Sequence, residues 1–426
     1  MNINKYFAKI KTSEIFKNTS ILVGGTIIAQ LIPILLQVIL RRLYAPEIFG
    51  AYSVFLSLFS IGVFFFTLRY ELSVINPKDD YEAQNILGVI FFISIIVFFI
   101  LEVILFLWNE KIVDIFNFPK DYSWWLYFLP LSLLFYAWFL GIQYWLVRKK
   151  NFKGISVNKI SRRLVEGVVQ LMFGSLNKSF GLLIGFLGGV IANFVVGIKQ
   201  SVGSGFSIRN LSIQKIRFVA GKYKEYPIFN AIPAFLNTAG LMLPIIFMNK
   251  FYGVEVTGYF DLTRQVLAVP IALLSVALSQ VYLQRFSERY NKRESIKKDL
   301  MMLWLFLGVI SFVSFIIIFF AGEMLFAVIF GQKWSVSGYY AEILIFKYVL
   351  IFMVSPVSNV LISLNKVKII SLWQIFYFFV IFSLKFFSHY SFEMFLIVYV
   401  VLELIAYLVY LALIIYNVRK YEKSLV

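Results

Sequence analysis

Long apolar runs recur along the whole chain, and their length limits what the chain can fold into. An α-helix rises about 1.5 Å per residue, so a run of about 20 apolar residues crosses the hydrocarbon core of a bilayer. Hydrophobic residues make up 61% of the chain and charged residues only 15%, well below the roughly 25% charged residues of a soluble domain. We expect about twelve spanning helices, at approximately 19–40, 50–72, 86–107, 124–147, 157–176, 180–198, 228–248, 258–283, 300–320, 341–363, 369–388 and 394–416. The sequence therefore predicts an all-α polytopic membrane protein.

Basic residues gather in alternate connections between these runs. The groups lie before the first run (Lys5, Lys9, Lys11 and Lys17) and at 148–159, 199–224, 285–298 and 419–423. The first run is too long for a signal peptide, and no cleavage site of small residues follows it. Because cytoplasmic loops carry an excess of lysine and arginine, both termini are predicted to be cytoplasmic. Arg41 and Arg42 are exceptions that fall on the outer side.

Several classes of function are excluded by what the chain lacks. The net charge of +18 follows from the topological excess of basic residues, so we expect no nucleic-acid partner. The absence of cysteine excludes disulfides and thiolate sites, and the single histidine, His389, is expected to be an ordinary loop residue. No GxxxxGK[ST] motif occurs, and Gly185, Gly188 and Gly189 indicate close helix packing. We expect no catalytic residue and no metal site.

A short pattern between two apolar runs occurs twice. Tyr44, Glu47 and Gly50 are spaced as Tyr252, Glu255 and Gly258 are, about 208 residues later. Two further echoes pair 115–117 with 329–331 and 153–156 with 368–371. Three echoes in the same order predict two six-helix lobes of the same orientation, related as parallel repeats. We assign 1–199 and 228–426 to these lobes and 200–227 to a basic cytoplasmic linker, an architecture typical of transporters.

Charged side chains inside the runs are candidates for a substrate site. Each costs about 2.5–3.5 kcal/mol at the bilayer centre, so each requires a partner or a water-filled cavity. Our candidates for a cationic cavity are Arg41, Arg42, Arg69, Arg264 and Lys347. Gln30 and Gln37 are seven residues apart on one helical face, which either faces a central cleft or forms hydrogen bonds between helices.

Carboxylates inside the runs are candidates for coupling transport to an ion gradient. These are Glu403, Asp261 and Glu71. Simple neutralisation is an alternative, because Asp261 and Arg264 are three residues apart and Arg162 and Glu166 are four apart. Glu403 could likewise form a buried ion pair with Lys347 or with Lys385. Glu102 is expected to extend to the outer interface.

The sequence resembles the polysaccharide biosynthesis proteins of the lipid-linked oligosaccharide flippase type, in particular the bacterial O-antigen and capsule flippases. These belong to the multidrug/oligosaccharidyl-lipid/polysaccharide exporter (MOP) superfamily. The resemblance spans nearly the whole chain. The residues that carry it are 25–30, Pro33, 42–44, Pro46, Phe49, Gly50, Tyr52, 68–72, 77–80, Tyr226, Pro227, Pro244, 252–259, Val269, Pro270, 329–331 and Trp334.

The resemblance implies a V-shaped pair of lobes with a central cavity that opens to one side at a time. It implies a substrate of undecaprenyl pyrophosphate carrying a short oligosaccharide, moved from the cytoplasmic to the outer leaflet of the bacterial inner membrane. Coupling to H⁺ or Na⁺, contact with membrane lipids, cooperation with a polysaccharide polymerase and chain-length proteins, and a monomeric state are expected by the same analogy. No other cofactor is expected.

Two other classes of function compete with the flippase. An exporter of small amphipathic cations from the same superfamily would use carboxylates, and Glu403 and Asp261 support that alternative. A membrane-embedded polysaccharide polymerase or ligase would need a sizeable outer loop, yet no predicted outer connection exceeds about 20 residues. A structural scaffold is disfavoured by the duplication and by the buried charges. We therefore expect a secondary transporter rather than an enzyme.

Overall fold

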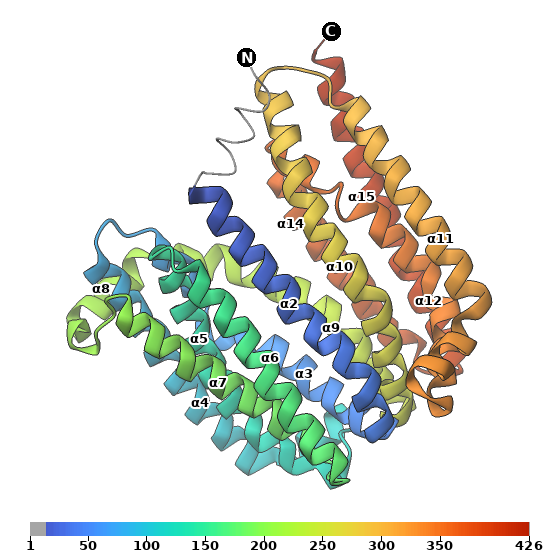
Figure 1. Ribbon diagram of the computed structural model, residues 1–426, viewed down its shortest axis with the longest axis horizontal. Helices are drawn as coiled ribbons and strands as arrows, with labels where there is room; N and C mark the ends of the chain where they lie inside the picture. Colours follow the sequence, from blue (N-terminus) through green and yellow to red (C-terminus); the bar gives the residue numbers. More distant parts are fainter. Residues whose placement is uncertain (1–13, 426) are drawn as a thin grey trace. The chain divides into compact units, whose positions relative to one another are not determined.

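Helices dominate the protein, whose computed structural model describes residues 14–425 (Figure 1). No β-strand occurs in that range. The chain divides into two compact units, unit 1 up to Phe235 and unit 2 from Leu236 onwards. The basic residues Lys5, Lys9 and Lys11, which support the predicted cytoplasmic N-terminus, lie outside the described residues.

Unit 1 consists of the first seven labelled helices and short helical turns between them. The long helices are α2 (Glu14–Leu43), α3 (Pro46–Thr67), α4 (Asp80–Phe116), α5 (Leu129–Arg148), α6 (Phe152–Ser175) and α7 (Gly181–Gly203), followed by the short α8 (Ile213–Lys222). The 3₁₀-helices are η1 (Tyr70–Ile75), η2 (Lys120–Phe128) and η3 (Ile208–Asn210), and a π-helical turn, η4, spans Tyr226–Ala231.

Unit 2 has a similar series of helices. They are α9 (Ile232–Tyr252), which begins in unit 1, α10 (Val254–Asn291), α11 (Lys297–Phe330), α12 (Ser335–Val354), α13 (Asn359–Ser363), α14 (Val367–Phe382) and α15 (Phe392–Lys423). The 3₁₀-helices are η5 (Gln332–Trp334) and η6 (Ser383–Phe387).

Ten helical segments within the described residues are long and apolar enough to cross a membrane. The protein is therefore an all-α, multi-pass membrane protein, as the apolar runs predict. The runs at 157–176 and 258–283 also form helices, α6 and α10, but these two are not among the ten. Helix α6 carries four charged residues within its run, Lys159, Arg162, Arg163 and Glu166. The count of twelve spans stays a prediction.

The helix boundaries differ from the predicted spans in a systematic way. The predicted second span, 50–72, is wrong at its end, because α3 stops at Thr67 and Leu68 and Arg69 adopt φ of 46° and 64°. Conversely, α4 and α11 are several residues longer than the apolar runs at 86–107 and 300–320. A hydropathy window ends at the first polar residues, whereas the hydrogen bonds of a helix continue into the interface.

The three sequence echoes occupy corresponding places in the two units. The first lies where α2 meets α3 and where α9 meets α10, with Glu47 and Glu255 in the first turn of the following helix. The second lies at the ends of α4 and α11, where Asn117 and Gly331 have φ of 48° and 106°. The third lies at the starts of α6 and α14.

Helix packing repeats in the same way. In unit 1, α4 packs on α5, α3 on α5, α5 on α7 and α6 on α7. In unit 2 the pairs are α11 with α12, α10 with α12, α12 with α15 and α14 with α15. Each pair in unit 2 corresponds to a pair in unit 1 in chain order. The two units therefore share these four pairings.

A close helix crossing in unit 2 depends on Gly338. A Cβ atom built on this residue of α12 would lie 2.4 Å from the Gly322 carbonyl oxygen and 2.4 Å from Cα of Glu323, both on α11. Backbone atoms cannot rotate away from such a clash as a side chain can. We expect Gly338→Ala to destabilise the protein by about 1–3 kcal/mol, measured as a lower apparent Tm in detergent.

Gly308→Ala is the matched control for this variant. Gly308 lies within α11, and a Cβ atom there would meet nothing within 4 Å. Alanine is the better helix former by up to about 1 kcal/mol, so the control is expected to keep or slightly raise Tm. Equal losses in the two variants would show that the crossing at Gly338 is not close.

Candidate functional sites in the membrane helices

Helix α6 carries a row of charged side chains along one face. Lys159, Arg162, Arg163 and Glu166 follow one another at spacings of three, one and three residues, which brings them to neighbouring positions on a helix surface. The row extends over about 10 Å along the helix axis. Helix α6 packs against α2 and α7. Of these charged groups Glu166 is buried, and Lys159, Arg162 and Arg163 are half-buried between the helices.

Glu166 pairs with Arg163 and not with Arg162. Its Oε2 atom lies 3.0 Å from Nη1 of Arg163, and its Oε1 atom accepts a hydrogen bond of 3.3 Å from the hydroxyl of Tyr52 on α3. The proposed neutralisation of Arg162 by Glu166 is therefore wrong. Sequence reasoning missed the role of Tyr52, which comes from a different helix.

Among the side chains that the structure describes, Arg162 and Lys159 have no carboxylate partner. The Arg162 guanidinium lies over the rings of Tyr136 and Phe186, at 5.1 Å and 5.7 Å from their centroids, and its buried Nε atom has no hydrogen-bond partner. Lys159 donates a hydrogen bond of 2.9 Å to the hydroxyl of Thr26. Since Glu166 pairs with Arg163, the row has two more basic residues than acidic ones.

Two glycines bring α7 directly onto this row. A Cβ atom on Gly189 would lie 2.9 Å from Cβ of Glu166 and 3.0 Å from the Arg162 carbonyl oxygen, and one on Gly185 would lie 2.4 Å from Cγ of Gln170. The predicted role of these glycines in close helix packing is confirmed. Gly188 makes only ordinary contacts with valine side chains.

Unit 2 contains a fully buried ion pair between α12 and α15. Nζ of Lys347 donates to Oε1 of Glu403 at 3.2 Å and to the hydroxyl oxygen of Tyr399 at 2.5 Å. The hydroxyl of Tyr377, on α14, donates to the same Glu403 oxygen at 3.0 Å. All four residues are at most 3% exposed. Lys385, the other basic partner considered for Glu403, is exposed and lies beside the rings of Phe382 and Phe386.

The Lys347 cluster leaves one polar atom without a partner. The Oε2 atom of Glu403 is buried and accepts no hydrogen bond. Sequence spacing could have indicated part of the cluster, because Tyr399, Glu403 and Tyr407 recur every four residues and share one face of α15. Tyr377 had no such signal, since only the packing of α14 on α15 brings it there.

A second carboxylate of unit 2 is neutralised within its own helix. Asp261 on α10 is 2% exposed, and its Oδ1 atom lies 3.8 Å from Nη2 of Arg264. Gln265 donates a hydrogen bond of 2.7 Å to Oδ2 of Asp261. The pairing of Asp261 with Arg264 that the spacing suggested is therefore present. The Arg264 side chain keeps 29% exposure.

The predicted polar residues of α2 lie in different environments. Arg41 is fully buried, donates a hydrogen bond of 2.8 Å to Oε1 of Gln37 and stacks 3.5 Å above the ring of Phe49. Arg42 and Gln30 are exposed. The two glutamines predicted to share one polar face therefore differ: Gln37 accepts a hydrogen bond from Arg41, whereas Gln30 is exposed.

Arg69 and Glu71 form a pair beyond the end of α3. Nη1 of Arg69 lies 3.5 Å from Oε1 of Glu71, whose side chain is 3% exposed while that of Arg69 is 31% exposed. The predicted second span, 50–72, includes both residues, but α3 ends before them and they lie in the turn that follows it. The pair thus joins a buried carboxylate to an arginine that is partly exposed.

Comparison with known proteins gives relatives over most of the chain. Residues 39–339 match the family described as polysaccharide biosynthesis protein. The teichuronic acid biosynthesis protein TuaB of Bacillus subtilis (strain 168) is 20% identical over 312 residues. That match covers 72% of this chain and 62% of the length of TuaB, so the chain spans less than two thirds of this curated relative.

Solved structures of transporters share the fold. An inward-facing multidrug resistance MATE family transporter of the MOP superfamily has a TM-score of 0.72 at 13% identity, covering 93% of this chain and 96% of that one. The lipid II flippase MurJ, in an inward closed conformation, has a TM-score of 0.71 at 13% identity, covering 95% and 90%. The fold is that of MOP superfamily transporters.

Proposed function

The chain belongs to the polysaccharide biosynthesis protein family, and from this premise we propose that it is a flippase for a lipid-linked oligosaccharide. In this proposal the cargo is an oligosaccharide on undecaprenyl pyrophosphate, which moves from the cytoplasmic to the outer leaflet of a bacterial inner membrane. Transport proceeds by alternating access and draws on an H⁺ or Na⁺ gradient, and both termini are cytoplasmic. The family, the multi-pass architecture and the transporter fold support this proposal.

The observation that carries the proposal is the excess positive charge on α6. Arg162 and Lys159 have no carboxylate partner among the described side chains, although charge inside a membrane helix is costly. A diphosphate carries the opposite charge, and an arginine fork binds phosphate oxygens through two parallel hydrogen bonds. The lipid tail can stay in the bilayer while the charged head group passes along the protein.

The other basic candidates divide into two groups in this proposal. Arg69 and Arg264 are partly exposed, so we assign them to the cargo together with Arg42. Arg41 and Lys347 are buried and already bonded to Gln37 and to Glu403, so we assign them to the stability of their units. Glu403, Asp261 and Glu71 are the proposed positions for coupling to the ion gradient.

An exporter of organic cations from the same superfamily is the second candidate. A cation site requires a carboxylate that is free to pair with the cargo. Each of Glu403, Asp261 and Glu71 lies beside a basic group of the protein itself, at 3.2 Å, 3.8 Å and 3.5 Å. The anionic cargo is therefore the better-supported choice. We further propose that the flippase acts as a monomer and cooperates with a polysaccharide polymerase and chain-length proteins.

Deletion of the gene tests the proposed function. We expect lipid-linked oligosaccharide to accumulate on the cytoplasmic face of the membrane and surface polysaccharide to disappear, with both restored by the intact chain. The measurement is the fraction of lipid-linked oligosaccharide that an enzyme added outside spheroplasts can reach. An unchanged accessible fraction would contradict the flippase, and increased sensitivity to cationic drugs in the same strain would favour the second candidate.

A further inference from the structure

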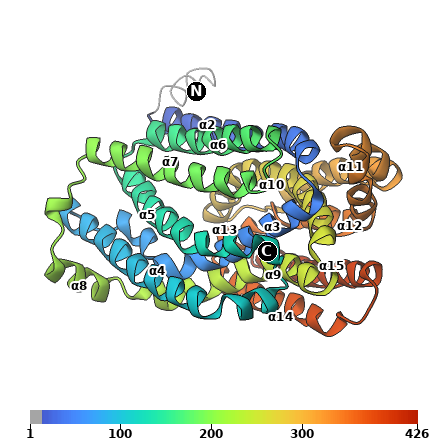
Figure 2. The same cartoon turned by 90° about the horizontal axis from the view of Figure 1, so that it is seen from below.

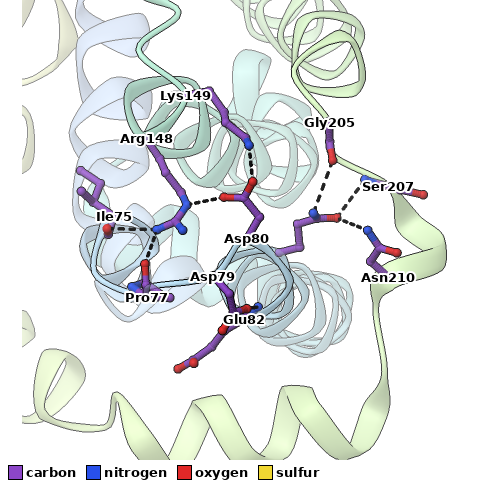
Figure 3. A network of polar contacts seen from close by, with 11 residues as sticks. Ile75, Pro77, Asp79, Asp80, Glu82, Arg148, Lys149, Gly205, Ser207 and Asn210 are labelled. Atoms are coloured by element: carbon purple, nitrogen blue, oxygen red, sulfur yellow. Dashed lines mark hydrogen bonds and ion pairs between the residues drawn. The ribbon is translucent and has the colours of Figure 1, made fainter.

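Side-chain hydrogen bonds hold the connection between α7 and α8, residues 204–212, against the first turns of α4. Oε1 of Gln84 accepts from the Ser207 backbone N–H at 3.0 Å and from Nδ2 of Asn210 at 3.1 Å, and its amide donates to the Gly205 carbonyl (Figure 3). Asn85 accepts from the Ser212 N–H at 2.9 Å. The predicted linker therefore contains an ordered segment that is part of unit 1.

The same end of α4 is tied to α5. Asp80 accepts a hydrogen bond of 2.9 Å from Nε of Arg148 and a further one from Lys149 (Figure 3). Arg148 also donates to the carbonyls of Ile75 and Pro77. Sequence reasoning missed this network. It holds the start of α4 against the end of α5.

One face of α8 packs against the first turns of α4 (Figure 2). Val219 is fully buried, and Ile216 fills the space above Gly88, where a Cβ atom would lie 2.7 Å from its Cδ1 atom. Lys222 donates a hydrogen bond of 2.6 Å to Glu82, and this bond raises the pKa of the Lys222 ammonium above its ordinary value. The orientation of α8 about its axis is thereby determined.

These contacts set the depth at which α8 lies. They extend along α4 from Glu82 to Gly88, which is about 9 Å of helix. The charged first turn of α4 marks the membrane boundary, and the apolar run begins near residue 86. The headgroup layer on each side of the hydrocarbon core is about 5–7 Å thick. Helix α8 therefore lies at the level of the lipid headgroups.

The opposite face of this segment combines exposed apolar and basic side chains. Ile208, Ile213 and Phe218 are 71%, 80% and 56% exposed. Arg209 and Arg217 lie among them, and Lys215 is half-exposed at the edge of this face, between the rings of Phe218 and of Tyr81 on α4. None of the three has a carboxylate partner among the described side chains. Residues 199–224 contain six basic residues and no acidic one: Lys199, Arg209, Lys215, Arg217, Lys222 and Lys224. Such a face is typical of helices that lie in a membrane interface.

We infer that η3 and α8 form a docking surface for anionic phospholipid. Arg209, Lys215 and Arg217 bind the phosphate headgroups of the inner leaflet, while Ile213 and Phe218 enter the boundary between headgroups and acyl chains. Lipid is the partner that fits, because the surface lies at headgroup depth and residues 199–224 contain no acidic residue. Since Gln84 and Asn85 hold the segment on α4, bound lipid anchors unit 1 itself. The inference does not depend on what the protein transports.

The absence of cysteine allows a direct test with spin labels. The chain contains no cysteine, so Phe218→Cys gives a single attachment site, and Asn291→Cys at the exposed end of α10 gives an aqueous reference. The purified full chain is reconstituted in phosphatidylcholine vesicles with or without phosphatidylglycerol. The measured quantity is the collision rate of each label with oxygen relative to a water-soluble nickel complex, which increases with depth in the bilayer.

We expect a higher oxygen-to-nickel ratio at position 218 than at position 291, and a further increase with phosphatidylglycerol. Arg209→Gln, Lys215→Gln and Arg217→Gln together should reduce the ratio at 218 and weaken the binding of phosphatidylglycerol by about fivefold per residue removed. The matched control, Lys366→Gln with Lys368→Gln, removes two exposed lysines of unit 2 and should leave the ratio at 218 unchanged. Equal ratios at 218 and 291, or no response to phosphatidylglycerol, would overturn the inference.

Discussion

Arg162→Gln is expected to block flipping while the protein still folds and reaches normal levels. The guanidinium of Arg162 packs over Tyr136 and Phe186, so its loss removes a cation–π contact of about 0.5–2 kcal/mol and changes Tm little. The loss of a charged hydrogen bond to the cargo costs about 1.5–3 kcal/mol, which corresponds to a decrease in transport of roughly 10- to 100-fold. The measurement is the externally accessible fraction of lipid-linked oligosaccharide.

Two further variants separate the role in transport from a structural role. Arg162→Lys keeps the charge but loses the fork geometry, so we expect intermediate transport. Arg419→Gln removes an exposed arginine at the end of α15 and should have no effect. Normal transport by Arg162→Gln at normal protein level would show that the excess charge on α6 does not bind the cargo.

Lys347→Met is expected to destabilise unit 2 by about 3–5 kcal/mol, because it leaves the carboxylate of Glu403 buried without its cation. The double variant with Glu403→Gln should recover more than half of that loss. Glutamine carries no charge, and its oxygen still accepts the hydrogen bond from Tyr377. The measurement is the apparent Tm in detergent, compared across the two single variants and the double variant.

Lys385→Met is the matched control for the buried lysine. Lys385 is exposed, and surface substitutions of this kind change stability by about 0.5 kcal/mol or less. If Lys347→Met resembled this control, the ion pair would not contribute to stability. If the double variant were no more stable than Lys347→Met, the cost would arise from lost packing around Lys347 rather than from an unpaired charge.

Helix content and membrane insertion follow from the sequence because lipid imposes one strict condition. Every backbone N–H and C=O group in the hydrocarbon core must be bonded within the protein, so a long apolar run has to be a helix. The joint at Pro46 and its counterpart at Gly253 were also readable from the sequence. Proline fixes φ and favours the start of a helix, whereas glycine allows the φ of 90° that Gly253 adopts before α10. The close helix packing at Gly185 and Gly189 could be predicted as well, because only a residue without a side chain lets two helices approach so closely.

Charge pairing required the tertiary structure. Glu166 has arginines three and four residues before it, and helix geometry allows both pairs equally, so Tyr52 on α3 and the closeness of α7 determine which one forms. The sequence likewise left Glu403 with a choice between Lys347 and Lys385. The packing of α12 on α15 brings Lys347 to the carboxylate and leaves Lys385 at the surface.

At the end of unit 1, too, the sequence shows the composition of a segment but not what it packs against. Composition alone revealed that residues 199–224 are basic and connect two apolar runs. Their attachment to α4 depends on Gln84 and Asn85, which are more than 120 residues away from their partners in the sequence. Local patterns thus determined where the chain is helical and which helices are apolar enough to cross a membrane. The tertiary structure decided which charges are neutralised and which stay available, because hydrogen bonds and ion pairs depend on distances of a few ångströms between helices that the sequence does not place.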